Sequence, residues 1–285
     1  MSVDMLQDKI RKMKNPSVVD FGVRDDQIPP HLLEEEGQEL NAYGRFCREL
    51  LEGLKDSVPA VRFSFGAFAL QGPDGLVLLS ELLNQAGELG YYVLLDAPEI
   101  FSPWDADRIA KTVFEQGKYP CHGLLVSPYI GSDAMKPFLP FCKSGEKALF
   151  AAVRSPNKSA VEIQDLLTGS RHVHIAVMDL INRLGDGMFG KFGYSPVGAA
   201  VSAANAVSVN AIRSRYNRAF LLVDGVDYPN GNYKNCSGAF DRFGHGAVVC
   251  AGPSVTAAWT QEEADSRGYV SCARQAADRM KKNLA

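Results

Sequence analysis

Charged side chains stand at the ends of several apolar runs in this chain. Asp96 closes the run YYVLLD, and Arg62 lies within AVRFSF. If these runs are parallel strands of one sheet, their carboxyl ends meet, and so do these side chains. Gathered carboxylates can bind a divalent or organic cation. An arginine inside a barrel either contacts a ligand or pairs with a carboxylate, and for Arg62 we expect a pair with Asp96. The acidic residues that can meet at this edge are Asp96, Glu99, Asp105, Asp224 and Asp227.

Eight short runs, most of them almost entirely apolar, are predicted as strands. Nearly continuous apolar runs of this length are typical of parallel strands that are buried on both faces. The predicted strands cover residues 18–23, 60–65, 91–96, 123–127, 148–153, 197–202, 220–224 and 246–250.

Segments with apolar residues at three- and four-residue spacing separate these runs and are predicted as helices. They cover residues 40–54, 75–86, 105–115, 134–142, 159–167, 172–183, 204–216 and 261–282. Eight strands alternating with helices predict a closed (β/α)8 TIM barrel, with an open doubly wound sheet as the alternative. Because no long linker interrupts the pattern, we expect a single domain over residues 1–285, with residues 1–15 as an N-terminal helical extension.

Composition excludes several classes of protein. The 285 residues carry a net charge of −3, which argues against binding nucleic acid by phosphate neutralisation. No apolar run approaches the roughly 20 residues of a membrane span, and the charged N-terminus does not resemble a secretory signal. The six cysteines form no CxxC pair and are expected to be reduced thiols, so we predict a cytoplasmic protein without a metal site.

Five strand-end segments resemble one known family. They read SPYIGSD, AVRSPNKSA, GYSPVGAAVSA, LLVDGVDYPNGN and HGAVVCAGPSV. They are similar to the NPYxGxD, RTSN, GYSxxGxVV, PGxGAQGG and GxxVxxSRGI blocks of the orotidine 5′-phosphate decarboxylases, in the longer bacterial subfamily. The resemblance runs from about residue 16 to residue 259. It implies a dimeric TIM barrel of pyrimidine nucleotide synthesis that decarboxylates orotidine monophosphate without metal or cofactor.

The family's catalytic signature is altered in this sequence. The resemblance places the signature DxKxxD after the third strand and a further lysine on the second strand. Asp96 matches the first aspartate, but the signature lysine falls on Pro98 and the second aspartate on Phe101. The strand-two lysine falls on Arg62, and the aspartate that follows strand one falls on Gly22, two residues after Asp20. A proline can neither carry charge nor donate a proton.

The phosphate-binding residues are altered as well. The resemblance places the family's phosphate-binding glutamine on Pro229 and its arginine on Pro253. Asp224 and Asp227 replace a proline and a glycine of the family in the same loop. Losing a guanidinium and gaining two carboxylates reverses the local field, so we expect a phosphate dianion to bind poorly.

Further candidate ligand contacts have structural alternatives. Ser127 matches a position that contacts the pyrimidine in the family, or it caps a turn. Arg154 and Asn157 line the mouth of the barrel, or they only close the loop after the fifth strand. His172 and His174, two residues apart on a predicted helix, are expected at the surface rather than at a metal.

The loop EIFSPWD is apolar where the family is highly charged. Phe101 and Trp104 therefore either plug the barrel mouth or form a hydrophobic subunit contact, since the family's dimer interface lies near this loop.

The sequence leaves three functional hypotheses. The first is a non-catalytic binding or structural subunit, in a homodimer or in a heterodimer with an active decarboxylase. The second is an enzyme with a changed ligand and changed chemistry at an acidic barrel mouth. The third is residual decarboxylase activity, for which Arg62 and Asp96 are the candidate catalytic residues.

Overall fold

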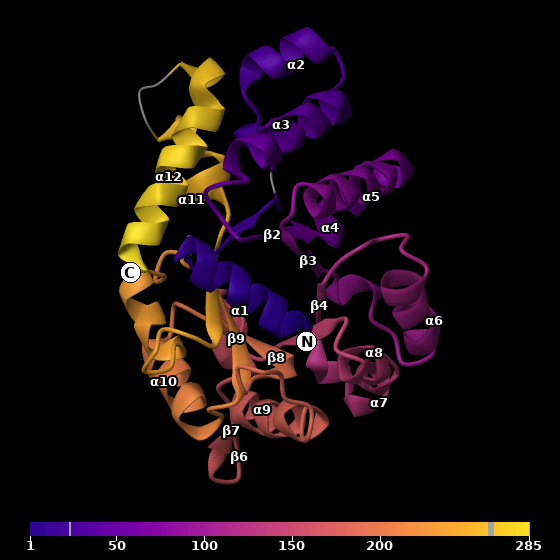
Figure 1. The fold of residues 1–285 in the computed structure, drawn as a ribbon, viewed down its shortest axis with the longest axis vertical. Coiled ribbons are helices and arrows are strands. Elements are labelled where there is room, and N and C mark those ends of the chain that lie inside the picture. The colour runs from indigo at the N-terminus through magenta and orange to yellow at the C-terminus, as the bar shows by residue number, and fades with distance from the viewer. Residues whose placement is uncertain (23, 262–264, 285) are drawn as a thin grey trace.

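A closed barrel of eight parallel strands forms the centre of the molecule (Figure 1), in a computed structural model that describes residues 1–22, 24–261 and 265–284. This arrangement confirms the predicted (β/α)8 barrel. In order around the barrel, the strands are β1 (Ser17–Asp20), β10 (Ala247–Ala251), β9 (Ala219–Asp224), β8 (Ser195–Ser202), β5 (Ala148–Ala152), β4 (Gly123–Val126), β3 (Tyr92–Asp96) and β2 (Ala60–Ser64).

The barrel strands coincide with the predicted apolar runs to within a few residues at each end. The prediction for the first strand extended to Val23, which lies outside the described residues, and β1 itself ends at Asp20. Each strand is buried along nearly its whole length, as both faces of a parallel sheet are covered.

Helices surround the barrel, most of them against the outer face of the sheet and α1 across one end (Figure 1). They are α1 (Ser2–Met13), α2 (Pro30–Glu36), α3 (Glu39–Leu54), α4 (Phe65–Ala69), α5 (Gly72–Glu88), α6 (Ala106–Ala110), α7 (Ser132–Met135), α8 (Leu139–Lys143), α9 (Val173–Leu184), α10 (Ala206–Arg215), α11 (Pro253–Thr256) and α12 (Tyr269–Asn283). The sequence did not indicate α2, α4 or α11. The predicted helix 261–282 includes residues 262–264, which lie outside the described residues.

Two predicted helices are interrupted or absent. The segment 134–142 is divided among α7, a 3₁₀ turn (Lys136–Phe138) and α8. Pro137 and Pro140 lie in this stretch, and a proline removes a helical hydrogen-bond donor. The segment 159–167 was predicted wrongly as a helix. It forms a 3₁₀ turn (Lys158–Glu162) and leads into a small hairpin of β6 (Leu167–Thr168) and β7 (Arg171–His172).

Alternate residues of each strand face two different hydrophobic layers. Side chains such as Val19, Val61 and Leu95 pack outward against the helices. Side chains such as Val18 and Leu94 point into the barrel and form a separate cluster. This two-residue periodicity also assigns the polar residues at the strand ends to the interior, above that cluster.

Helix α1 closes the floor of the barrel, at the amino ends of the strands. Val3, Leu6 and Ile10 belong to the cluster inside the barrel, and Leu6 is fully buried. The Ser2 hydroxyl lies 2.9 Å from Tyr92 Oη, and the Gln7 Oε1 accepts a hydrogen bond from the Gly246 amide at 3.0 Å. The predicted N-terminal helical extension is therefore an integral part of the barrel core.

In the described parts of the chain, no helix combines the length and hydropathy needed to cross a membrane. All six cysteines are buried, and none of them is joined in a disulfide within the described residues.

Shortening the central side chain of α1 will test its role as the floor of the barrel. We expect Leu6→Ala to lower the free energy of unfolding by about 3 kcal/mol, because it leaves a cavity among fully buried neighbours. Urea denaturation followed by circular dichroism measures this change, and the exposed Lys12→Ala on the same helix is the matched control. Equal stability of the two variants would show that α1 does not support the barrel.

Candidate functional site

The candidate site lies at the carboxyl ends of the strands, opposite α1. The inward-facing positions there are occupied by Asp20 on β1, Arg62 on β2, Asp96 on β3, Asp224 on β9 and Cys250 on β10. The two-residue alternation of each strand explains this set, because Val18, Ala60, Leu94, Leu222 and Val248 lie two residues earlier and point into the barrel.

Arg62 forms the centre of this layer. Its Nε donates to Asp20 Oδ1 at 3.2 Å and its Nη2 to Asp20 Oδ2 at 2.9 Å. Its Nη1 donates to Asp224 Oδ2 at 2.6 Å. The Arg62 side chain is 9% exposed, so these carboxylates supply the counter-charge that burial requires.

The expected ion pair between Arg62 and Asp96 is wrong, because strand register favours other partners. Asp20 lies directly opposite Arg62 across the β1–β2 pair. Asp96 lies opposite Ser64, one inward position farther along the barrel axis. The structure therefore gives Arg62 ion pairs with Asp20 and Asp224. The sequence did contain a signal for this pairing. Asp20 lies two residues after Val18, so both side chains point into the barrel.

The protonation of the central groups follows from this geometry. Burial alone would lower the pKa of Arg62, but Asp20 and Asp224 outweigh it and hold that pKa well above its usual value. Burial also raises the pKa of Asp96 to about 7; the positive charge of Arg62 opposes this rise, while Asp224, Asp20 and Glu99 add to it. Asp96 therefore exchanges a proton near neutral pH, whereas Arg62 stays charged.

A cavity of about 320 Å³ opens at this end of the barrel, which we call the mouth cavity. It is lined in part by Asp20, Arg62, Asp224, Asp227, Pro229 and Pro253. The Asp227 Oδ2 accepts a hydrogen bond from the Gly252 amide at 2.7 Å. The Gly252 amide, which lines the cavity, therefore already donates to a carboxylate of the protein and is not available to an anion.

The acidic residues expected to meet at the mouth only partly do so. Asp224 and Asp227 line the mouth cavity, while Asp105 is 43% exposed and pairs with Arg108. The Glu99 carboxylate lies against Gly66 of α4. Across the described ranges of the chain, no group of three or more His, Cys, Asp or Glu side chains is placed to hold a metal ion.

The loop after β3 does not fill the mouth. Pro98 begins a 3₁₀ turn (Pro98–Ile100), and Phe101 turns outward to pack on Phe138, with ring centroids 5.6 Å apart. Trp104 is 97% exposed. The plug hypothesis is therefore wrong for both aromatic residues.

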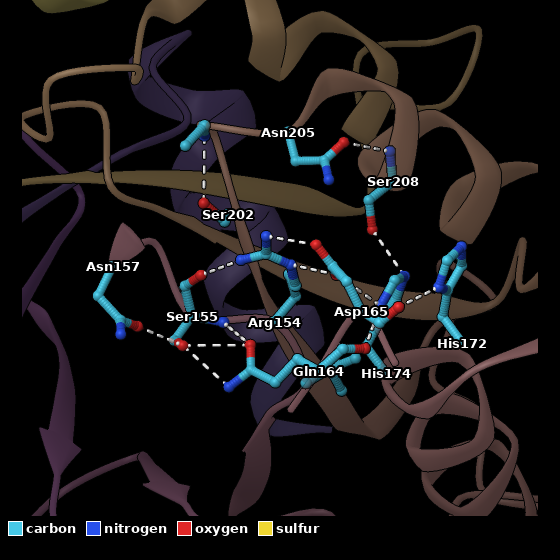
Figure 2. A network of polar contacts seen from close by, with 12 residues as sticks. Arg154, Ser155, Asn157, Gln164, Asp165, His172, His174, Ser202, Asn205 and Ser208 are labelled. Atoms are coloured by element: carbon cyan, nitrogen blue, oxygen red, sulfur yellow. Dashed lines mark hydrogen bonds and ion pairs between the residues drawn. The ribbon is translucent and has the colours of Figure 1, made fainter. Parts of the chain in front are cut away.

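Arg154 belongs to a network of polar contacts beside the mouth (Figure 2). Its guanidinium is buried and donates to Asp165 at 2.9 and 3.0 Å and to the Ser155 carbonyl at 2.5 Å. Asn157 is exposed and accepts a hydrogen bond from the Ser155 hydroxyl. The Pro156 ring lies against Gly225, so this network adjoins the Asp224 loop.

The same network includes a histidine that we expected at the surface. His174 is buried; its Nδ1 donates to the Gln164 carbonyl and its Nε2 lies 3.1 Å from the Ser208 hydroxyl (Figure 2). Burial lowers the pKa of His174. His172 is exposed and stacks on the His174 ring. The segment 164–172 thus folds back onto Arg154, which explains why no helix forms before α9.

Ser127 lies at the start of a 3₁₀ turn (Pro128–Ile130), where β4 ends. Its side chain makes no capping hydrogen bond, so the alternative of a cap is wrong.

The raised pKa of Asp96 predicts how stability depends on pH. Between pH 3.8 and about 7, the folded protein keeps a proton on Asp96 that the unfolded chain has released. This residue's contribution to stability is therefore present at low pH and is lost as the pH rises through that range. We expect Asp96→Asn to remove the loss, as measured by urea unfolding at several pH values.

The exposed Asp278→Asn, on α12, is the matched control for this measurement and should keep the wild-type pH dependence. If Asp96→Asn and the wild type lose stability in parallel from pH 4 to pH 7, the carboxyl of Asp96 ionises normally.

Comparisons with known proteins cover nearly the full chain, although no family model matches. The orotidine 5′-phosphate decarboxylase of Clostridium novyi is 26% identical over 285 residues, which span 99% of this chain and 98% of the relative. The enzyme of that name from Rhodopirellula baltica is 27% identical over 275 residues, which span 92% of this chain and 91% of the relative.

Solved structures share the barrel. The Leishmania donovani OMP decarboxylase superposes with a TM-score of 0.72 at 22% identity and covers 99% of both chains. The Plasmodium berghei orotidine 5′-monophosphate decarboxylase gives a TM-score of 0.76 at 12% identity, covering 99% of this chain and 98% of the other. Along nearly its whole length the chain is therefore similar in sequence to orotidine 5′-phosphate decarboxylases, and it shares their barrel.

Proposed function

We propose that this protein is a non-catalytic relative of the orotidine 5′-phosphate decarboxylases that acts as a binding or structural subunit. The observation that carries the proposal is the pairing of Arg62 with both Asp20 and Asp224. Arg62 stands where the resemblance places a catalytic lysine. In this protein its guanidinium forms ion pairs with two carboxylates of the same chain.

Decarboxylation leaves a carbanion that a general acid must protonate. The second lysine position is Pro98, which has no proton to give. The pKa of Arg62 is held well above its usual value, so the guanidinium does not release a proton near neutral pH. Neither lysine position of the family therefore supplies a proton donor in this protein.

Binding of a phosphate is opposed at the same mouth. Asp20, Asp224 and Asp227 all line the mouth cavity, and Asp227 already occupies the Gly252 amide. A phosphate dianion a few ångströms from a carboxylate is repelled by several kcal/mol at an intermediate dielectric. Arg62 does not offset this repulsion, since its donors are engaged.

Direct assay of the purified protein tests the proposal. We expect no release of carbon dioxide from orotidine monophosphate. At the mouth we expect no binding of orotidine or uridine monophosphate, so any calorimetric binding of these nucleotides should be unchanged in Arg62→Met. The Clostridium novyi relative, prepared in parallel, is the positive control. Turnover that disappears in Arg62→Met and Asp96→Asn would instead establish residual decarboxylase activity. Binding of a different ligand at the mouth would favour an enzyme with changed chemistry.

We further propose a subunit contact on the loops that follow β2, β3 and β4. These strands are neighbours in the barrel, so the loops that follow them adjoin. They expose Leu70 (89%), Trp104 (97%) and Ile130 (43%) to solvent. Large apolar side chains gathered on one side are typical of protein interfaces. The partner is a second copy of this chain or an active decarboxylase subunit, and on the resemblance we place the assembly in the cytoplasm.

Removing the tryptophan tests this surface. We expect Trp104→Ala to raise the dimer dissociation constant at least about tenfold, since buried tryptophans dominate many interfaces. Light scattering over a dilution series measures the mass of the wild type and of the variant. Val207→Ala, which removes an 80% exposed apolar side chain on α10, is the control. An unchanged mass in Trp104→Ala would show that this surface is not the interface.

A further inference from the structure

A second cavity lies at the opposite end of the barrel from the mouth, beside the floor helix. Its volume is about 510 Å³, which is ordinary for a small-molecule site. The carboxyl end of α1, a 3₁₀ segment (Tyr233–Ala239), the loop before β10 and the end of α12 all contribute to it. Figure 1 shows the end of α1 close to the C-terminal end of α12. We call it the floor cleft.

The floor cleft is positively charged in an acidic protein. Arg11, Lys14 and Lys234 line it, and its described lining contains no aspartate or glutamate. All three cations are exposed, and none of them takes part in an ion pair within the described residues. Unpaired cations around a concave surface attract anions.

Lys14 has an unusual backbone conformation. It adopts a left-handed conformation with φ of 49°, which is the sole positive φ of a non-glycine residue in the described chain. Glycine or asparagine is the usual residue at such a helix end. The conformation is stabilised because the Asn15 amide donates to the Ile10 carbonyl at 3.1 Å. A lysine at this position costs backbone strain and places a cation on the cleft.

Aromatic rings form the other part of the lining. Tyr233 and Phe240 are half-buried in the cleft wall, and Phe243 is 65% exposed at its rim. The Arg242 guanidinium lies over the Phe243 ring, 4.7 Å from its centroid, so a ligand ring would use the other face. Exposed aromatic faces stack on flat rings of ligands. The cleft therefore combines a surface for a ring with cations for a negative charge.

The loop that carries Phe243 is held rigidly by one carboxylate. Asp241 Oδ1 accepts hydrogen bonds from the Phe243 and His245 amides, at 2.8 and 2.9 Å. Asp241 Oδ2 accepts one from the Tyr194 hydroxyl at 2.7 Å. Because the Asp241 carboxylate accepts these three hydrogen bonds, it repels a nearby anion less. The same bonds fix the loop, so the Phe243 ring is preorganised for binding.

We propose that the floor cleft binds an organic anion of about mononucleotide size that carries an aromatic ring. The ring stacks against Phe243, and the negative group lies between Lys14 and Lys234. The site is separate from the mouth, so the proposal does not depend on whether the mouth is catalytic.

Calorimetry with adenosine monophosphate as the probe tests this site in the full-length protein. We expect adenosine, which lacks the charge, and inorganic phosphate, which lacks the ring, each to bind at least about tenfold more weakly than the nucleotide. Both Phe243→Ala and the double variant Lys14→Glu/Lys234→Glu should lose at least about tenfold in affinity. Raising the salt concentration should weaken binding of the wild type.

The double variant Lys118→Glu/Lys143→Glu reverses two exposed lysines away from the cleft and is the matched control. It should bind the nucleotide like the wild type. The proposal is overturned if the nucleotide gives no binding heat, if phosphate binds as tightly as the nucleotide, or if Lys14→Glu/Lys234→Glu binds it unchanged. All the substituted side chains are exposed, so we expect each variant to fold, and circular dichroism verifies this.

Discussion

The buried charge of Arg62 determines how the mouth of this barrel is built. A guanidinium without counter-ions would be strongly destabilising in the barrel interior. Strand register supplies one carboxylate, because Asp20 lies opposite Arg62 on the neighbouring strand. The other comes from β9, which is separated from β2 around the barrel by β1 and β10. The two ion pairs therefore span four adjacent strands, and the pair with Asp224 depends on the curvature that brings β9 across the barrel from β2.

The same principle recurs around the mouth, where polar groups that could hold a ligand are bound to partners within the chain. Asp227 accepts the Gly252 amide, and Arg154 is engaged by Asp165 through two hydrogen bonds. Each of these contacts satisfies a donor that an anionic ligand would otherwise use. A barrel end of this type leaves few donors free for an anion, whereas the floor cleft exposes Arg11, Lys14 and Lys234.

Local sequence patterns were sufficient to predict the barrel, because continuous apolar runs mark parallel strands wherever they occur. The gathering of Arg62, Asp96 and Asp224 could also be predicted, since all three lie at strand ends. Their pairing could not, because it depends on a register that no single run encodes. Phe101 was misplaced for a related reason, as its direction depends on Phe138 in a distant segment. His174 and the segment 159–167 were predicted wrongly because Arg154, a residue outside that window, organises them.

The floor helix has a consequence for the order in which the chain folds. Helix α1 and β1 are synthesised first, yet β1 pairs with β10, and Gln7 accepts its hydrogen bond from Gly246, which is 239 residues away. Such distant contacts form slowly, because the loop between them must close before they stabilise anything. Until β10 has been made, the apolar face of α1 and one edge of β1 lack their final partners. Unpaired strand edges and exposed apolar faces of this kind favour aggregation of partly folded chains.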